Sequence, residues 1–153
     1  MKIALRWMLV ILLFLLMPSS LVAADTTTCE QLEKIFKVDV EEEDGVCLVE
    51  IIRGDIEASH MGLKLSPETM ELVFHFAFEE VDKQMVVMGE MALLEEEVNP
   101  VIDALRKANL EVSALHNHML HEQPRILYVH VQGMGDLQAL AKGLKNAIDQ
   151  TKN

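Results

Sequence analysis

Histidines are concentrated in one short part of the chain: four of the six lie between residues 116 and 130, as His116, His118, His121 and His130. Side chains at i and i+2 of a β-strand point to the same face. A third imidazole from a neighbouring strand would complete a set of three nitrogens, which suits zinc or copper better than calcium or magnesium. The spacing makes His116, His118 and His130 a candidate metal site. The alternatives are that they are polar residues on an open sheet face or hydrogen-bonded residues at a dimer interface.

The alternation of apolar residues predicts how the second strand of this site is oriented. In the segment 125–132 every second residue is apolar, the set being Leu127, Val129 and Val131. Because successive strand residues face opposite sides, Tyr128 and His130 point away from that apolar face. Tyr128 lies beside His130 and is therefore a candidate ligand contact.

The segment 111–118 is the predicted partner strand. His116 and His118 share one of its faces, and Leu115 and Asn117 share the other. If Leu115 packs with the apolar set of 125–132 beneath the helices, the three histidines project together from the opposite face of the sheet. A register slip of one residue would send His130 to the other side.

The two cysteines, Cys29 and Cys47, are the only ones in the chain. An even number in a chain bound for an oxidising compartment favours an intramolecular disulfide. A bridge closing a loop of this length would stabilise the fold by about 3 kcal/mol in the chain-entropy model. Two separate buried thiols are the alternative.

Residues 1–24 have the pattern of a cleavable signal peptide. Lys2 and Arg6 precede an apolar run over residues 9–17, and Val22 and Ala24 fit the small-residue positions before a cleavage site. The run is shorter than the roughly 20 residues of a membrane-spanning helix. We expect cleavage before Asp25, a single exported domain over residues 25–153 that is periplasmic or secreted, and no stable membrane anchor.

The charge of the mature domain excludes one class of partner. Cleavage would leave 11 basic and 25 acidic residues, a net charge of −14. Nucleic-acid binding needs clustered lysine and arginine, so we expect no nucleic-acid partner. Solvation of a small exported domain accounts for this charge.

The first half of the mature chain is predicted to contain one helix and three strands. The helix covers residues 28–37 with Thr28 as its cap, and an acidic turn over 41–45 follows. Strands are expected at 46–53, 71–79 and 84–91, and the segment 54–67 reads as a loop or irregular strand.

The second half alternates helices and strands. Three glutamates at 95–97 favour the start of a helix. Pro100 cannot lie deep in that helix, so either 95–98 forms a tight first turn or Asn99 is the cap. Asn109 is expected to end the helix. Strands at 111–118 and 125–132 follow, then a glycine turn over 133–135 and a helix capped by Asp136. This order predicts an α+β fold: an antiparallel, ferredoxin-like split strand–helix–strand sheet with helices on one face, extended by an N-terminal helix and strand, its other face open or dimerised.

Several short sequence motifs resemble those of the LppY/LpqO-type family of exported bacterial proteins. They are VMGE (87–90), LEEEVNPV (94–101), EVSALHNHML (111–120), PR (124–125) and HVQGMGD (130–136). The similarity covers most of 46–149 and is specific over 86–136. No reaction is established for that family, so the resemblance implies export and an intact domain.

The resemblance also bears on individual residues. It places His116, Asn117, His118 and His130 at motif positions, so Asn117 becomes a candidate ligand contact. Arg53 and Asp55 match an Arg-x-Asp element upstream, and Arg53 is a further candidate contact. The chain departs from the family in lacking a lipid-accepting cysteine and in four positions to which no role is transferred: Cys29, Cys47, His75 and His121.

Three functions stay open at this point. The first is an exported binding domain of unknown ligand, with zinc or copper at the histidine site. The second is a metal-assisted hydrolase or histidine acid–base enzyme helped by Glu90 or Glu122, although no catalytic grouping stands out. The third is a structural homodimer that buries the histidine face, whose association would change with pH.

Overall fold

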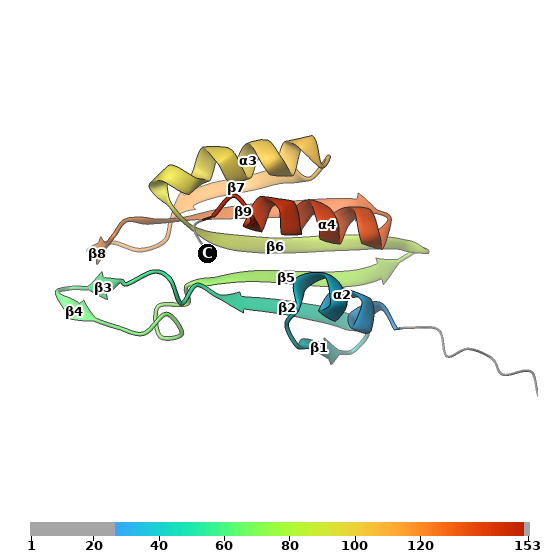
Figure 1. Cartoon of the computed structure of the whole chain (residues 1–153), viewed down its shortest axis with the longest axis horizontal. Helices are drawn as coiled ribbons and strands as arrows, with labels where there is room; N and C mark the ends of the chain where they lie inside the picture. The colour runs from blue at the N-terminus through green and yellow to red at the C-terminus, as the bar shows by residue number, and fades with distance from the viewer. Residues whose placement is uncertain (1–26, 152–153) are drawn as a thin grey trace, which may run out of the picture.

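Six antiparallel strands form the main sheet within residues 27–151, the part of the chain that the computed structural model describes. In spatial order they are β1 (Val40–Glu43), β2 (Val46–Ile52), β5 (Val73–Val81), β6 (Gln84–Leu94), β9 (Ile126–Gly135) and β7 (Glu111–Asn117) (Figure 1). Every neighbouring pair is antiparallel. The short strand β1 and the histidine-bearing strand β7 are therefore the two edges.

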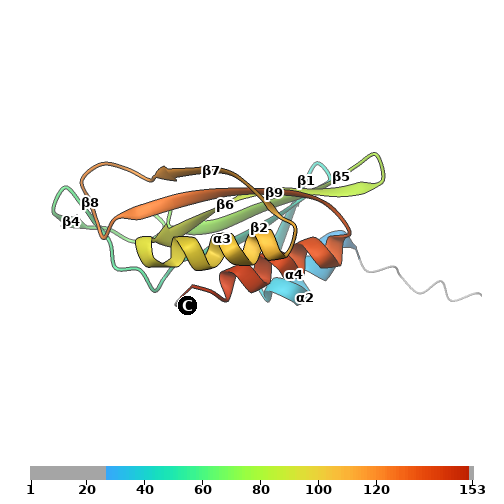
Figure 2. The same cartoon turned by 90° about the horizontal axis from the view of Figure 1, so that it is seen from above.

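The helices of this part of the chain all lie on one face of the sheet, as Figure 2 shows. They are α2 (Thr28–Phe36), α3 (Val98–Lys107) and α4 (Leu137–Ile148). The cap of α2 is Thr27, whose hydroxyl accepts the backbone N–H of Glu30 while the Glu30 carboxylate accepts the N–H of Thr27. The predicted cap Thr28 is thus wrong by one residue, because the capping box requires the residue three before the glutamate. Asp136 caps α4 as predicted.

The start of α3 follows the first of the two predicted alternatives. A single tight turn, η2 (Glu95–Glu97), precedes the helix, which begins at Val98 and not after an Asn99 cap. Pro100 is the third helical residue, where the missing N–H would have had no intrahelical acceptor. Asn109 follows the helix in the left-handed conformation, with φ of 58°, and so acts as the predicted stop.

The order β6–α3–β7–β9–α4 forms the predicted split strand–helix–strand arrangement. β9 lies between β6 and β7, and β5 pairs with the other side of β6. The strand from the N-terminal side therefore completes the central sheet, and the predicted α+β class is confirmed.

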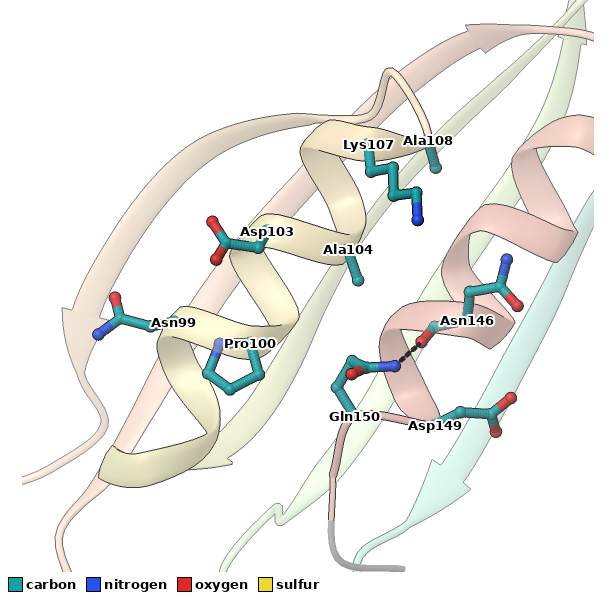
Figure 3. Close-up of a pocket in the computed structure, with 9 residues that line it drawn as sticks. All are labelled: Asn99, Pro100, Asp103, Ala104, Lys107, Ala108, Asn146, Asp149 and Gln150. Atoms are coloured by element: carbon teal, nitrogen blue, oxygen red, sulfur yellow. Dashed lines mark hydrogen bonds between the residues drawn. The ribbon is translucent and has the colours of Figure 1, made fainter.

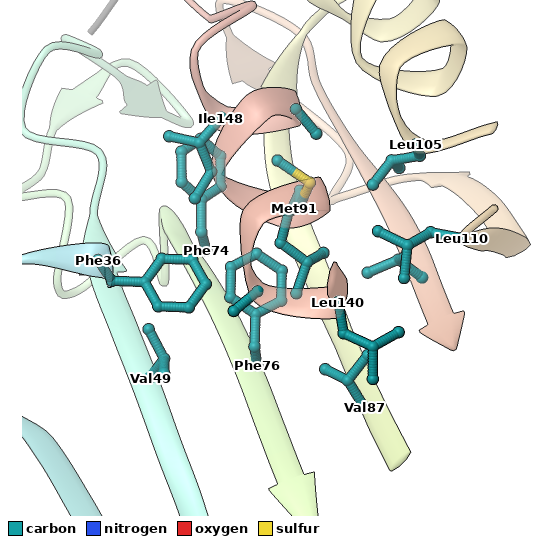
Figure 4. Packing of buried hydrophobic residues seen from close by; sticks show 14 of the residues in the cluster. Phe36, Val49, Phe74, Phe76, Val87, Met91, Leu105, Leu110, Leu140 and Ile148 are labelled. Atoms are coloured by element: carbon teal, nitrogen blue, oxygen red, sulfur yellow. The ribbon is translucent and has the colours of Figure 1, made fainter. Parts of the chain in front are cut away.

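The principal core lies between the sheet and the helices (Figure 4). Phe74, Phe76 and Phe78 on β5 are completely buried there. Phe36 of α2 stacks on Phe76 with ring centroids 6.0 Å apart. Because β5 alternates, the intervening His75 must project from the opposite face.

The chain itself covers part of the opposite face, which was expected to be open or dimerised. The chain between β2 and β5 folds over one end and forms a second buried cluster: Ile56, Ala58, Met70, Leu72, Ala92, Ile126 and Tyr128. A three-stranded sheet extends this end, made by β4 (Leu63–Lys64), β3 (Ser59–His60) and β8 (Glu122–Gln123). Beyond the covered end, Met88 and Met134 are more than half exposed.

Two predicted turns are strands in the structure. The acidic stretch Glu41–Glu43 pairs with β2, and only Asp44 and Gly45 turn the chain, both with positive φ. Pairing therefore overrides the low strand propensity of glutamate. β9 likewise continues through Gly135, and a Cβ on Gly133 would lie 2.5 Å from a methyl of Leu110. Glycine there permits close packing and does not form a turn.

Cys29 of α2 and Cys47 of β2 form the predicted disulfide. The bridge joins the N-terminal helix to the sheet. The predicted signal segment, residues 1–24, lies outside the described residues. Over residues 27–151, no helix is both long enough and apolar enough to cross a membrane.

Candidate functional site

Two of the three predicted metal ligands meet at the β7–β9 edge of the sheet. His116 pairs with Tyr128, and a bulge between Val112 and Ala114 brings Ala114 opposite His130. The Nε2 atoms of His116 and His130 are 2.9 Å apart. Nδ1 of His116 lies 3.1 Å from the carbonyl oxygen of Asn117. A carbonyl only accepts, so Nδ1 donates, and a neutral His116 presents the lone pair of Nε2 to His130.

Glu90 supplies a carboxylate to the same place. It lies on β6 directly opposite His130, with its Oε2 3.5 Å from Nε2 of His130. Both side chains are 36% exposed. Two imidazole nitrogens and a carboxylate oxygen thus gather where solvent ions can reach them.

His118 is held separately by Glu122. Its Nδ1 lies 2.7 Å from Glu122 Oε2, and both side chains are almost buried. Glu122 also accepts the backbone N–H groups of Ile126 and Met119. Because Glu122 is fixed by these bonds, it orients the His118 ring and leaves Nε2 as the ring nitrogen for chemistry. Over residues 27–151, no three His, Cys, Asp or Glu side chains are arranged to hold a metal ion as they stand.

Tyr128 lies between the two histidine groups. Its ring stacks with His116 and His118, with centroids 6.0 and 4.7 Å away. Its hydroxyl donates to the carbonyl of Glu71. Burial raises the pKa of Tyr128, as do the nearby carboxylates of Glu90, Glu71 and Glu122. The residue therefore stands beside the histidines as expected, but its hydroxyl is already bonded within the protein.

Asn117 shapes the loop after β7. Its amide nitrogen donates to the carbonyl of Met119 at 2.7 Å, and its amide oxygen accepts from Arg125 at 3.1 Å. These bonds use both ends of the amide to hold the loop that carries His118. Asn117 therefore positions this loop, and the geometry assigns it no direct ligand contact.

Arg53 is completely buried, and its guanidinium bonds only to protein groups. It donates to both carboxylate oxygens of Asp55, to both of Glu97 and to the carbonyl of Ala92, at 2.8–3.0 Å. The guanidinium also lies over the ring of Phe74, 5.0 Å from its centroid. All five N–H donors are thus used, and the expectation that Arg53 contacts a ligand is replaced by a structural role.

This network predicts a pH-dependent stability. Hydrogen bonding to Arg53 lowers the pKa of Asp55 from its ordinary value of 3.8. A carboxyl group whose pKa is lower in the folded state stabilises the fold above its ordinary pKa, and this stabilisation is lost as the pH falls through the lowered value. We expect Asp55→Asn to be less stable than the wild type at about pH 6, with the difference shrinking below pH 3.8.

Urea unfolding over this pH range measures that difference. Glu57→Gln is the matched control, because Glu57 makes an exposed ion pair with Lys64 and should change stability little at any pH. A gap between Asp55→Asn and the wild type that stays constant from neutral to acid pH would contradict the assignment.

Leu115 does not pack beneath the helices as predicted. It lies opposite the buried Val129, but it is 47% exposed. The alternation was correct, since Val129 and Val131 are buried on the helix-covered face while His130 faces away. β7 is an edge strand, so its helix-side residues are less covered than those of β9.

Sequence reasoning assigned no role to His75 and did not connect Glu50 to the site. The register aligns Glu50, His75, Glu90 and His130 across β2, β5, β6 and β9. The alternation of Phe74, Phe76 and Phe78 could have oriented His75, but only the strand order brings it beside Glu90. Glu50, His75 and Glu90 line a pocket of about 300 Å³.

Another concavity lies on the helical side, between α3 and α4 (Figure 3). This groove of about 850 Å³ is lined by Asn99, Pro100, Asp103, Ala104, Lys107, Ala108, Asn146, Asp149 and Gln150. Its charged groups have both signs. It lies on the helix layer, whereas the histidines project from the other face of the sheet.

Residues 30–150 match the profile of a family described as Domain of Unknown Function (DUF1259). The chain belongs to this family. The DUF1259 match includes His116, His118, His130, Glu90 and Arg53, whereas Cys29 lies just before it. No curated protein and no solved structure matches the chain.

Proposed function

We propose that this DUF1259 domain is an exported binding protein that holds a transition-metal ion, zinc or copper, at His116 and His130. The observation that carries the proposal is the 2.9 Å separation of their Nε2 atoms. Two nitrogens at about 2.0–2.1 Å from one ion lie about 2.9–3.4 Å apart for coordination angles of about 90–109°. The ring nitrogens already have the separation of two ligands on one ion.

The surroundings of the two rings favour a cation. The bond from Nδ1 of His116 to the Asn117 carbonyl sets the tautomer in which Nε2 carries the lone pair that binds a metal. That lone pair accepts the Nε2–H of His130, so metal binding would require the His130 proton to move to Nδ1. A change of side-chain rotamer would bring the Glu90 carboxylate from its position near His130 into the coordination shell. Water or a ligand from solution would fill the remaining position, as in open metal sites.

The cysteines support export. A disulfide persists in the periplasm or outside the cell and is rare in the cytosol. The Cys29–Cys47 bridge therefore agrees with the signal-like pattern of residues 1–24. In such a compartment an exposed histidine site samples metals from outside the cytosol.

Metal titration of untagged protein tests the proposal. We expect wild-type protein to bind Zn²⁺ or Cu²⁺, and His116→Ala/His130→Ala to lose at least about 100-fold in affinity, because both nitrogen ligands are removed. His121→Asn is the control, since His121 is exposed and asparagine tolerates its positive φ of 63°. Equal binding by the wild type and the double variant would refute this site.

A second candidate function, acid–base or nucleophilic catalysis by His118, is favoured by its 2.7 Å contact with the buried Glu122. A carboxylate that fixes one ring nitrogen leaves the other correctly oriented to take a proton or attack a carbonyl. Hydrolysis of p-nitrophenyl acetate is a suitable probe. We expect His118→Ala to lower the protein-dependent rate at least about tenfold, while His121→Asn retains it; a rate unchanged by His118→Ala would exclude this role.

A further inference from the structure

Four side chains form a row across the inner strands, on the face opposite the helices. The register places Glu50 of β2 opposite His75 of β5, His75 opposite Glu90 of β6, and Glu90 opposite His130 of β9. Directly opposed residues project to one face, with Cβ atoms about 4.5–5.5 Å apart. Carboxylates and imidazoles therefore alternate along the row, and Glu90 has an imidazole on each side.

The row continues into a pocket on its β2–β5 side. Glu50, His75 and Glu90 line this pocket of about 300 Å³, and the chain before β5 adds Glu68 and Glu71. Glu90 thus belongs to two places: it lines the pocket, and its Oε2 is 3.5 Å from the His130 ring. Donor atoms suited to divalent ions are present on both sides of this one carboxylate.

We propose that Glu90 bridges two divalent transition-metal ions, one held by His116 and His130 and the other by His75 and Glu50 in the pocket. This inference rests on the proposed metal-binding function and extends it to a second ion. A carboxylate has two oxygens and can give one to each ion, as in two-metal sites whose ions lie about 3.5–4 Å apart.

Spacing and charge support the bridged pair. Neighbouring strands lie about 4.8 Å apart, so the rings on β5 and β9 flank the strand that carries Glu90. Imidazole and carboxylate together form a donor set for Zn²⁺, Mn²⁺ or Co²⁺. Ions at these positions would also offset the repulsion between the carboxylates that face the pocket.

A cobalt titration of the untagged full-length mature protein separates the two ions. Equilibrium dialysis gives the number of Co²⁺ bound, and visible absorption reports their coordination. We expect two Co²⁺ per wild-type chain, one in His75→Gln and one in His116→Ala/His130→Ala. Glu90→Gln should weaken both at least about tenfold.

The controls distinguish this inference from the proposed function. Glu79→Gln removes an exposed carboxylate from the same face of β5, outside the row, and should keep both ions. A single Co²⁺ that His75→Gln leaves in place would overturn the bridged pair while the first site stands, and no binding by the wild type would overturn both. Two ions that persist in His75→Gln would also overturn the bridged pair. If Glu90→Gln does not fold, the number of ions bound by His75→Gln tests the inference.

Discussion

Replacing Arg53 with methionine is expected to lower the free energy of unfolding by about 3–5 kcal/mol, the usual cost of removing one partner from a buried ion pair. Methionine fills a similar volume but leaves the carboxylate of Glu97, 2% exposed, without the guanidinium that bonds both of its oxygens. Chemical denaturation with urea measures the change. A loss below about 1 kcal/mol would contradict the structural role of Arg53.

Two further variants show where this cost arises. Arg125→Met is the control, because Arg125 is exposed and bonds to Asn117 at the surface; a change within about 0.5 kcal/mol is expected. Adding Glu97→Gln to Arg53→Met removes the buried charge of Glu97, while the charge of the partly exposed Asp55 stays, and should recover part of the stability. No recovery in the double variant would show that the buried charge of Glu97 is not the cause of the loss.

Removing the disulfide is expected to destabilise the fold by about 2–4 kcal/mol. The Cys29→Ala/Cys47→Ala variant frees a loop closed over a sequence separation of 18 residues. α2 is a nine-residue helix, too short to be stable alone, so residues near the N-terminus should lose protection first. Hydrogen exchange and urea unfolding of the wild-type and variant proteins measure both effects.

Cys29 and Cys47 belong to the core on the helix side of the sheet, whereas the histidines project from the opposite face. Metal binding therefore serves as the control for this experiment. Zinc or copper affinity of the folded double variant should equal that of the wild type. Lost metal binding in a folded variant would show that the cysteines support the site as well as the fold. Two free thiols in natively secreted protein would contradict the bridge itself.

Local patterns predicted the helices and five of the six strands of the main sheet, all except β1, because each of these elements carries its own periodicity. Alternation at Val129 and Val131 identified the helix-covered face of β9, and Asp136 marked the start of α4. Gly133 was misinterpreted for a physical reason: its small size serves Leu110 and Leu140, which come from elsewhere in the chain. From the sequence alone, a glycine that is required for close packing against residues far away in the chain cannot be distinguished from a glycine that forms a turn.

The candidate site could be predicted only in part. The spacing of His116 and His118, with the alternation around His130, placed all three on one side, but side-chain partners decided which of them meet. Glu122 holds His118 apart through a contact that depends on the loop conformation. The contribution of His75 depends on the order β5–β6–β9, which no local pattern encodes.

Long-range pairs were the least predictable feature. Arg53 and Glu97 are 44 residues apart in the chain and belong to different elements. The sequence segments that contain Arg53 and Glu97 show no pattern that would predict their contact. Their contact exists because the sheet brings the end of β2 close to the start of α3, after which burial requires the guanidinium to find acceptors.

The glutamates of β1 have a consequence for self-association. Edge strands expose unpaired backbone groups that can recruit a strand from another molecule. Here the edge is only four residues long and carries Glu41, Glu42 and Glu43. A second copy approaching through the same edge would bring like charges together, so β1 disfavours growth of the sheet by strand addition at this edge.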